Sequence, residues 1–150
     1  MEFNKPVSNP FLVGAIKLIQ ENPTDENRKT FWDEVMRSEF LTPIYLDPEP
    51  RKGENGSMRI LPDTNMRVPT LVATDGQEYL AAYTDQDEFD KWKTESQVYK
   101  VSMTFDDYIN MLLYKKENVE NDTAGFVINP FSSNIIVTKD MVAKLILLRK

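Results

Sequence analysis

The chain of 150 residues contains no histidine and no cysteine. Without histidine it lacks the commonest general base, the relay residue of a serine-type triad and the commonest metal ligand. Without cysteine it cannot form disulfides, thiolate zinc sites or a cysteine nucleophile, and it suits a reducing cytoplasm. These absences disfavour an enzyme, which ranks third among the functions left open, and we predict no catalytic residue, no metal site and no cofactor.

Glycine and long apolar runs are also scarce. The five glycines fit neither the GxGxxG nor the GxxxxGK[ST] spacing of phosphate-binding loops. No apolar run approaches the roughly 18 to 20 residues of a membrane span, and the N-terminus lacks the basic region of an export signal. We therefore expect a soluble, cytoplasmic protein.

The excess of acidic residues limits the choice of partner. The formal net charge is −6 and the isoelectric point is about 4.8. Such a charge disfavours contact with phosphate backbones and with anionic lipid headgroups. We expect no nucleic-acid partner and no membrane partner.

What is present is the composition of an ordinary folded domain, with 41% hydrophobic and 28% charged residues. Asn9-Pro10 is typical of a helix start, and Thr24 or Asp25 predicts the cap of a second helix. Asp75-Gly76 favours a hairpin turn between two strands. Pro43, inside a strand predicted over 40–47, indicates that this strand lies at a sheet edge or bulge.

Periodicity and caps along the whole chain give the order ααβββαβαββα. This order predicts an α/β (α+β) fold with one mixed sheet of about five to six strands packed with about five helices. We find no linker, so residues 1–150 are expected to form a single domain.

The segment from about residue 48 to 66 is rich in proline, glycine and charge, which predicts a long, mobile connection. Arg51, Lys52, Arg59 and Arg67 gather in or beside it. A solvated loop is the favoured interpretation. A site for an anion or an acidic partner is the alternative.

The densest acidic run, Asp85 to Asp90, superficially matches a calcium loop. An EF-hand loop needs glycine at its sixth position and glutamate at its twelfth, where this chain has Asp90 and Ser96. We therefore predict that Thr84 or Asp85 caps a short helix here, whose first-turn carboxylates complement the helix dipole, and a weak magnesium site is the alternative.

Two motifs resemble one known family. The segment from Tyr79 to Asp85, followed by Phe89 and Trp92, resembles the strand ("lpaFTs") and short helix of the SseB (enhanced serine sensitivity) N-terminal domain. The segment from Gly125 to Ser132 is similar to the glycine-led "INP" stretch of that family. The resemblance implies one SseB N-terminal-like domain of a bacterial protein, and it implies no established reaction, cofactor or catalytic residue.

The sequence departs from the family pattern at two positions. Tyr83 stands where phenylalanine is usual, and Asp85 stands where serine is common. Two functions rank above an enzyme. We favour a non-catalytic interaction or regulatory domain, and the alternative is a domain that binds an amino acid or another metabolite.

Thr84, Asn129 and Ser132 are the polar candidates for a ligand site, in a pocket near the Tyr83-Thr84 and Asn129-Pro130 loops. Strand ends in mixed folds border crevices, which is where ligands bind. For Asn129 we favour a structural role, in which its amide bonds nearby backbone to close the turn between strands.

The helix predicted from about Lys139 onward is apolar over more than the roughly 100° that covering one side of a sheet requires. Two interpretations stay open: a helix buried deep in the core, or an apolar surface for a homodimer, a partner protein or the domain that follows in longer relatives. The predicted interface residues are Met141, Leu145, Leu147 and Leu148.

Overall fold

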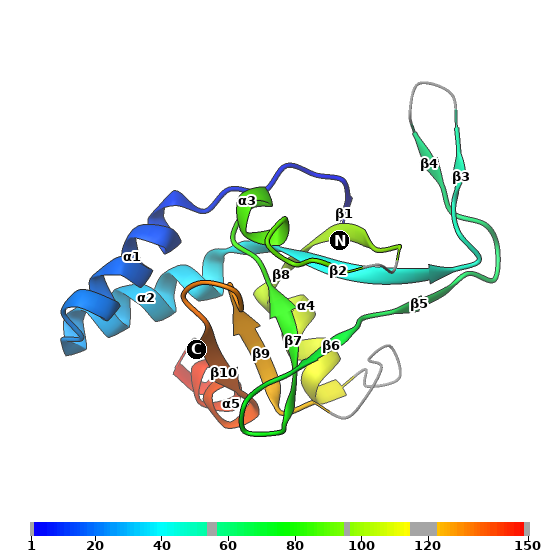
Figure 1. Ribbon diagram of the computed structural model, residues 1–150. Coiled ribbons are helices and arrows are strands. Elements are labelled where there is room, and N and C mark those ends of the chain that lie inside the picture. The colour runs from blue at the N-terminus through cyan, green and yellow to red at the C-terminus, as the bar shows by residue number, and fades with distance from the viewer. Residues whose placement is uncertain (1, 54–56, 95–96, 115–122, 149–150) are drawn as a thin grey trace.

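The computed structural model describes residues 2–53, 57–94, 97–114 and 123–148 (Figure 1). Helices α1 (Pro10–Glu21) and α2 (Asp25–Arg37) pack against each other. Asn9 is the N-cap residue of α1, and the Thr24 side chain accepts a hydrogen bond of 3.1 Å from the Asn27 amide to cap α2. Both predicted helix starts are confirmed.

The first sheet has four antiparallel strands in the order β1-β8-β2-β5. They are β1 (Glu2–Phe3), β8 (Tyr99–Thr104), β2 (Glu39–Asp47) and β5 (Asn65–Arg67). The long β2 pairs with β8 along its first half and with β5 at its end.

The second sheet has the order β10-β9-β7-β6 and is mixed, because β7 and β9 run parallel while the other pairs are antiparallel. Its strands are β6 (Thr70–Val72), β7 (Glu78–Ala82), β9 (Gly125–Ile128) and β10 (Ile135–Thr138). Gly76, at φ 82°, turns the chain between β6 and β7. The hairpin predicted at Asp75-Gly76 is therefore confirmed.

Among the described residues, one isolated backbone bridge connects the two sheets. The Leu41 amide donates to the Tyr83 carbonyl at 2.9 Å, and the Tyr83 amide donates back at 3.0 Å. The α+β class is thus confirmed, but the single sheet that we predicted is divided into two. The predicted order of helices and strands is correct once the short strands β1, β3, β4 and β5 are set aside.

The edge position predicted from Pro43 is wrong for the strand as a whole, because β2 lies between β8 and β5. The proline is tolerated by a local gap. The backbone amides of a strand point alternately to its two sides. The nitrogen of Pro43 therefore points to the same side as the Leu41 amide, away from β8. On that side β5 pairs only with Tyr45 to Asp47, so no ladder bond is lost at Pro43.

The predicted long connection at 48–66 contains strands. β3 (Arg51–Lys52) and β4 (Met58–Arg59) form a separate two-stranded hairpin that projects from the body of the molecule (Figure 1). Its residues 54–56 lie outside the described ranges. The mobility of the segment stays a prediction.

Three helical segments follow the β6–β7 hairpin along the chain. They are α3 (Gln86–Phe89), α4 (Phe105–Ile109), which continues as the π-helical turn η2 (Asn110–Tyr114), and α5 (Lys139–Leu148). Thr104 and Asp107 form a reciprocal capping box at the start of α4, as their spacing predicts. None of the described helices combines the length and the apolar character that crossing a bilayer requires.

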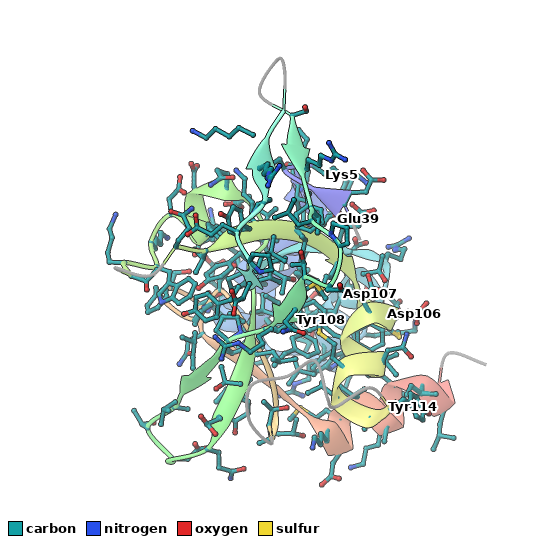
Figure 2. All side chains as sticks on the ribbon, turned by 90° about the vertical axis from the view of Figure 1, so that its right-hand side faces the viewer. Lys5, Glu39, Asp106, Asp107, Tyr108 and Tyr114 are labelled. Atoms are coloured by element: carbon teal, nitrogen blue, oxygen red, sulfur yellow. The ribbon has the colours of Figure 1, made fainter. Side chains whose placement is uncertain are left out.

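Tyr108 is fully buried in the main hydrophobic core, to which both sheets and several helices contribute side chains. It points inward from α4, whereas Tyr114, at the far end of η2, points outward (Figure 2). The Tyr108 hydroxyl donates to the Ala81 carbonyl at 2.8 Å, and burial raises the pKa of this phenol. The buried polar group is therefore satisfied inside the protein.

We predict opposite effects for two alanine substitutions at glycines. A Cβ at Gly125 would overlap the carbonyl oxygen of Val137, which is backbone of the paired strand, so Gly125→Ala should lower the free energy of unfolding by about 3 kcal/mol. Gly14 is exposed in α1 with no atom near the added methyl group. Gly14→Ala should raise the stability by up to about 1 kcal/mol. Urea denaturation followed by circular dichroism measures both, and equal effects would contradict the prediction.

Candidate functional site

Thr84 and Asn129 come together where two strands of the second sheet end. Asn129 directly follows β9, and Thr84 lies two residues after the parallel strand β7. The Thr84 amide donates to Asn129 Oδ1 at 3.0 Å, and Asn129 Nδ2 donates to Thr84 Oγ1, also at 3.0 Å. Their exposed fractions are 0% and 5%, so this pair is buried.

A second asparagine completes the junction. The Nδ2 group of Asn9 donates to the carbonyl oxygen of Thr84 at 2.8 Å and to that of Glu39 at 2.7 Å. Asn9 is the N-cap residue of α1 by position, but its side chain makes no capping hydrogen bond. The sequence offered only the capping signal, so this long-range role of Asn9 was not predicted.

Asn129 also organises the loop that follows it. Its backbone adopts φ 50°, which asparagine tolerates better than most residues. Its carbonyl oxygen accepts hydrogen bonds from the amides of Ser132 at 3.1 Å and Asn134 at 2.8 Å. The backbone of Asn129 thus closes its own turn, while its side chain bonds the neighbouring loop at Thr84. Asn129 is thus tied into the structure, but not in the predicted way, because its backbone and not its side-chain amide closes the turn.

An open groove of about 440 Å³ lies between α1 and these loops. All three predicted site residues, Thr84, Asn129 and Ser132, line it. The sequence did not mark the other lining residues, which are Val13, Ile16, Lys17, Gln20, Asp85, Glu88 and Ser133.

The polar groups of the groove differ in how far they are already bonded. Ser132 is exposed, and its hydroxyl donates to Glu88 Oε1 at 2.5 Å. Asp85 accepts from the Glu88 amide and from Thr84 Oγ1, each at 3.0 Å, so its carboxylate caps α3 as predicted. The Ser133 hydroxyl oxygen is buried and has no hydrogen-bond partner among the described residues. Ser133 therefore supplies the groove with a buried hydroxyl group that the described residues leave without a hydrogen-bond partner.

Tyr83 anchors the short helix α3 against the strand. Its ring packs edge-on against Phe89 at 5.2 Å between centroids, and Trp92 packs against the same cluster. The Tyr83 hydroxyl is buried without a partner among the described residues, and burial raises its pKa. The position thus uses the aromatic ring alone, which explains why phenylalanine would serve there equally well.

The two motifs that resembled one family therefore meet in space, with Tyr83-Thr84 on one side of the junction and Asn129-Pro130 on the other. A family model of the SseB protein N-terminal domain matches residues 12–144, a span that includes both. The chain belongs to the SseB family. No curated protein and no solved structure gives a significant match to it.

Within this SseB chain, α5 divides its apolar residues between core and surface. Val142 and Leu145 are buried, with Leu145 only 5% exposed. Met141, Leu147 and Leu148 are 40%, 70% and 78% exposed. Leu145 must therefore be removed from the predicted interface set, because it packs in the core. The other three residues remain on the surface.

No group of three or more acidic side chains is placed to hold a metal ion in the described part of the SseB chain. Three carboxylates of the run at 85–90 instead make hydrogen bonds or ion pairs within the chain. Asp90 accepts a hydrogen bond of 2.7 Å from Gln86, and Glu88 pairs with Lys91 at 2.6 Å.

We predict that Asn129→Ala lowers the free energy of unfolding by about 3 kcal/mol. The change leaves the buried Thr84 amide without its acceptor and places alanine at a positive φ. Ser132→Ala, in the same loop but exposed, is the matched control and should stay within about 0.5 kcal/mol of the wild type. Chemical denaturation measures both. A loss below about 1 kcal/mol for Asn129→Ala would show that the junction contributes little to folding.

Proposed function

We propose that residues 1–150 form a non-catalytic interaction domain of a bacterial cytoplasmic protein, which self-associates through α5. The observation that carries this proposal is the exposure of Met141, Leu147 and Leu148 on a helix that already buries Val142 and Leu145 in the core. Large apolar side chains grouped on a surface commonly mark an interaction site.

The positions of these residues favour a second copy of the chain as the partner. Met141 and Leu148 are seven residues apart and lie on the same side of α5. An antiparallel pairing around a two-fold axis midway between these two residues would bring Met141 of each copy against Leu148 of the other. Lys144 lies between them, where its stem can cover apolar surface while its ammonium group reaches water.

The predicted ligand residues support a non-catalytic role. The amide, carbonyl and hydroxyl groups of Thr84 all bond within the protein, and both ends of the Asn129 side-chain amide are used in the same junction. Groups committed in this way are poorly available to bind or activate a substrate.

We predict that the double variant Leu147→Lys, Leu148→Lys stays folded and loses self-association. Both side chains are largely exposed, so the added charges meet water in the monomer but would be buried and unpaired in the dimer. Sedimentation velocity over a range of concentrations measures association, and thermal denaturation measures folding. Leu145→Lys, one turn earlier but in the core, is the matched control and should lower stability by several kcal/mol.

Two results would contradict this proposal. A wild type that stays monomeric at the highest concentrations leaves no role for a second copy, and a partner of another kind would then have to cover α5. A double variant that unfolds as readily as Leu145→Lys would mean that Leu147 and Leu148 are part of the core.

A second candidate function is the binding of an amino acid or related metabolite in the groove between α1 and the two motif loops. Two observations favour it: the three predicted site residues share this groove, and the Ser133 hydroxyl within it has no partner among the described residues. Lys17 on α1 and Glu88 on α3 supply charges of both signs, which suits a zwitterion.

We predict for this candidate that one of the common amino acids raises the melting temperature saturably, because a ligand that binds only the folded state stabilises it. Differential scanning fluorimetry with each amino acid in turn measures the shift. Lys17→Glu should abolish it, whereas Lys29→Glu, a charge reversal on the exposed side of α2, should not. The absence of a shift with every amino acid would remove this candidate in its amino-acid form.

A further inference from the structure

The β3–β4 hairpin is a basic arm on an acidic protein. We use the name basic arm for Arg51, Lys52 and Arg59, its three described cationic residues, all of which are exposed. The whole chain has a net charge of −6, so these cations stand out against the average charge of the molecule. In Figure 1 the hairpin extends beyond the rest of the molecule, on the side opposite to α5.

The strand register places two of these cations against each other. Arg51 is the direct partner of Arg59 across the hairpin, and residues that face each other in a ladder project from the same face. Like charges at directly opposed positions destabilise a strand pair. Within the described part of the chain neither guanidinium group has a hydrogen bond or an ion pair. The hairpin therefore keeps a repulsive pair that no group of the described protein neutralises.

The arm has little else to hold it. Its two strands belong to neither of the larger sheets, and a two-stranded hairpin alone is marginally stable in water. Lys52 faces the other way and lines a groove of about 790 Å³ between the hairpin and the body, where Lys100 is another lining residue. The arm thus carries a cation on each face, but Glu49 also lines the groove on the Lys52 side, so the face with Arg51 and Arg59 is the purely cationic one.

We propose that the basic arm binds an acidic segment of a partner protein, with a carboxylate held between the guanidinium groups of Arg51 and Arg59. Two guanidinium groups on one face match the planar, paired oxygens of a carboxylate. Binding would replace the repulsion across the hairpin by two attractive contacts. The segment would not compete with a partner on α5, which lies at the other side of the molecule.

The net negative charge of the whole molecule favours a short acidic peptide segment over a nucleic acid as the ligand of the basic arm. A long polyanion would also approach the acidic surface that gives the chain its net charge of −6, and would be repelled there. A short segment needs to contact the arm alone, so it gains the local attraction with little of that repulsion.

The test measures fluorescence anisotropy of a labelled oligoglutamate peptide with the full chain. The wild type should bind, and the affinity should fall as salt is raised from about 0.1 M to about 1 M, which shortens the screening length from about 10 Å to about 3 Å. Arg51→Glu with Arg59→Glu should weaken binding by about tenfold or more. Arg28→Glu with Lys29→Glu makes the same change in net charge on the exposed side of α2, and should weaken binding by less than about threefold.

A single variant separates binding from folding. Arg59→Glu puts a carboxylate opposite Arg51, which should leave the melting temperature unchanged or raise it while weakening peptide binding. Three outcomes overturn the proposal: no binding by the wild type, equal weakening by the two double variants, or tighter binding of a single-stranded oligonucleotide of matched charge. The last would identify a phosphate-bearing partner instead.

Discussion

Two asparagine side chains, Asn9 and Asn129, bond Thr84 and thereby connect helix α1 and both sheets at one point. Asn129 takes the Thr84 amide and hydroxyl, and Asn9 takes the Thr84 carbonyl together with that of Glu39. These few bonds fix the start of α1, the start of β2 and the ends of β7 and β9 at one point. Because β2 belongs to the first sheet and β7 to the second, the junction couples the sheets, as do the Leu41–Tyr83 bridge and the Tyr108 hydroxyl, which bonds Thr42 and Ala81.

This constraint also explains the two family motifs without reference to a ligand. The threonine of one motif and the asparagine of the other bond each other at a buried position, where an unsatisfied amide would cost about 1 to 3 kcal/mol. The aromatic residue before Thr84 anchors α3 through its ring. The motifs thus mark a folding junction, and a groove forms beside it because α1 is tied to the same point through Asn9.

Local chemistry allowed the helix starts, the Asp75-Gly76 hairpin and the order of the main elements to be predicted from the sequence. What could not be predicted depends on distant partners. Asn9 carries the same capping signal whether its amide caps α1 or reaches Glu39 and Thr84. The division into two sheets follows from how much of β2 meets β7, which no local pattern encodes. In the same way Leu145 and Leu148 are equally apolar, and only tertiary packing buries one and exposes the other.

The residues that form the proposed interaction surfaces differ from the junction in what they do for the isolated domain. The Asn129–Thr84 bonds stabilise it, whereas the opposed pair Arg51 and Arg59 weakens its hairpin and the exposed Leu147 and Leu148 lower its solubility. Folding alone gives no reason for such groups at those positions. Under the two proposals their energetic gain would arise on association, where a carboxylate would neutralise the arginines and a second helix would cover the leucines. The polar junction in the interior therefore has its hydrogen bonds made within the chain, whereas the groups of the two proposed surfaces would gain free energy only by binding a partner.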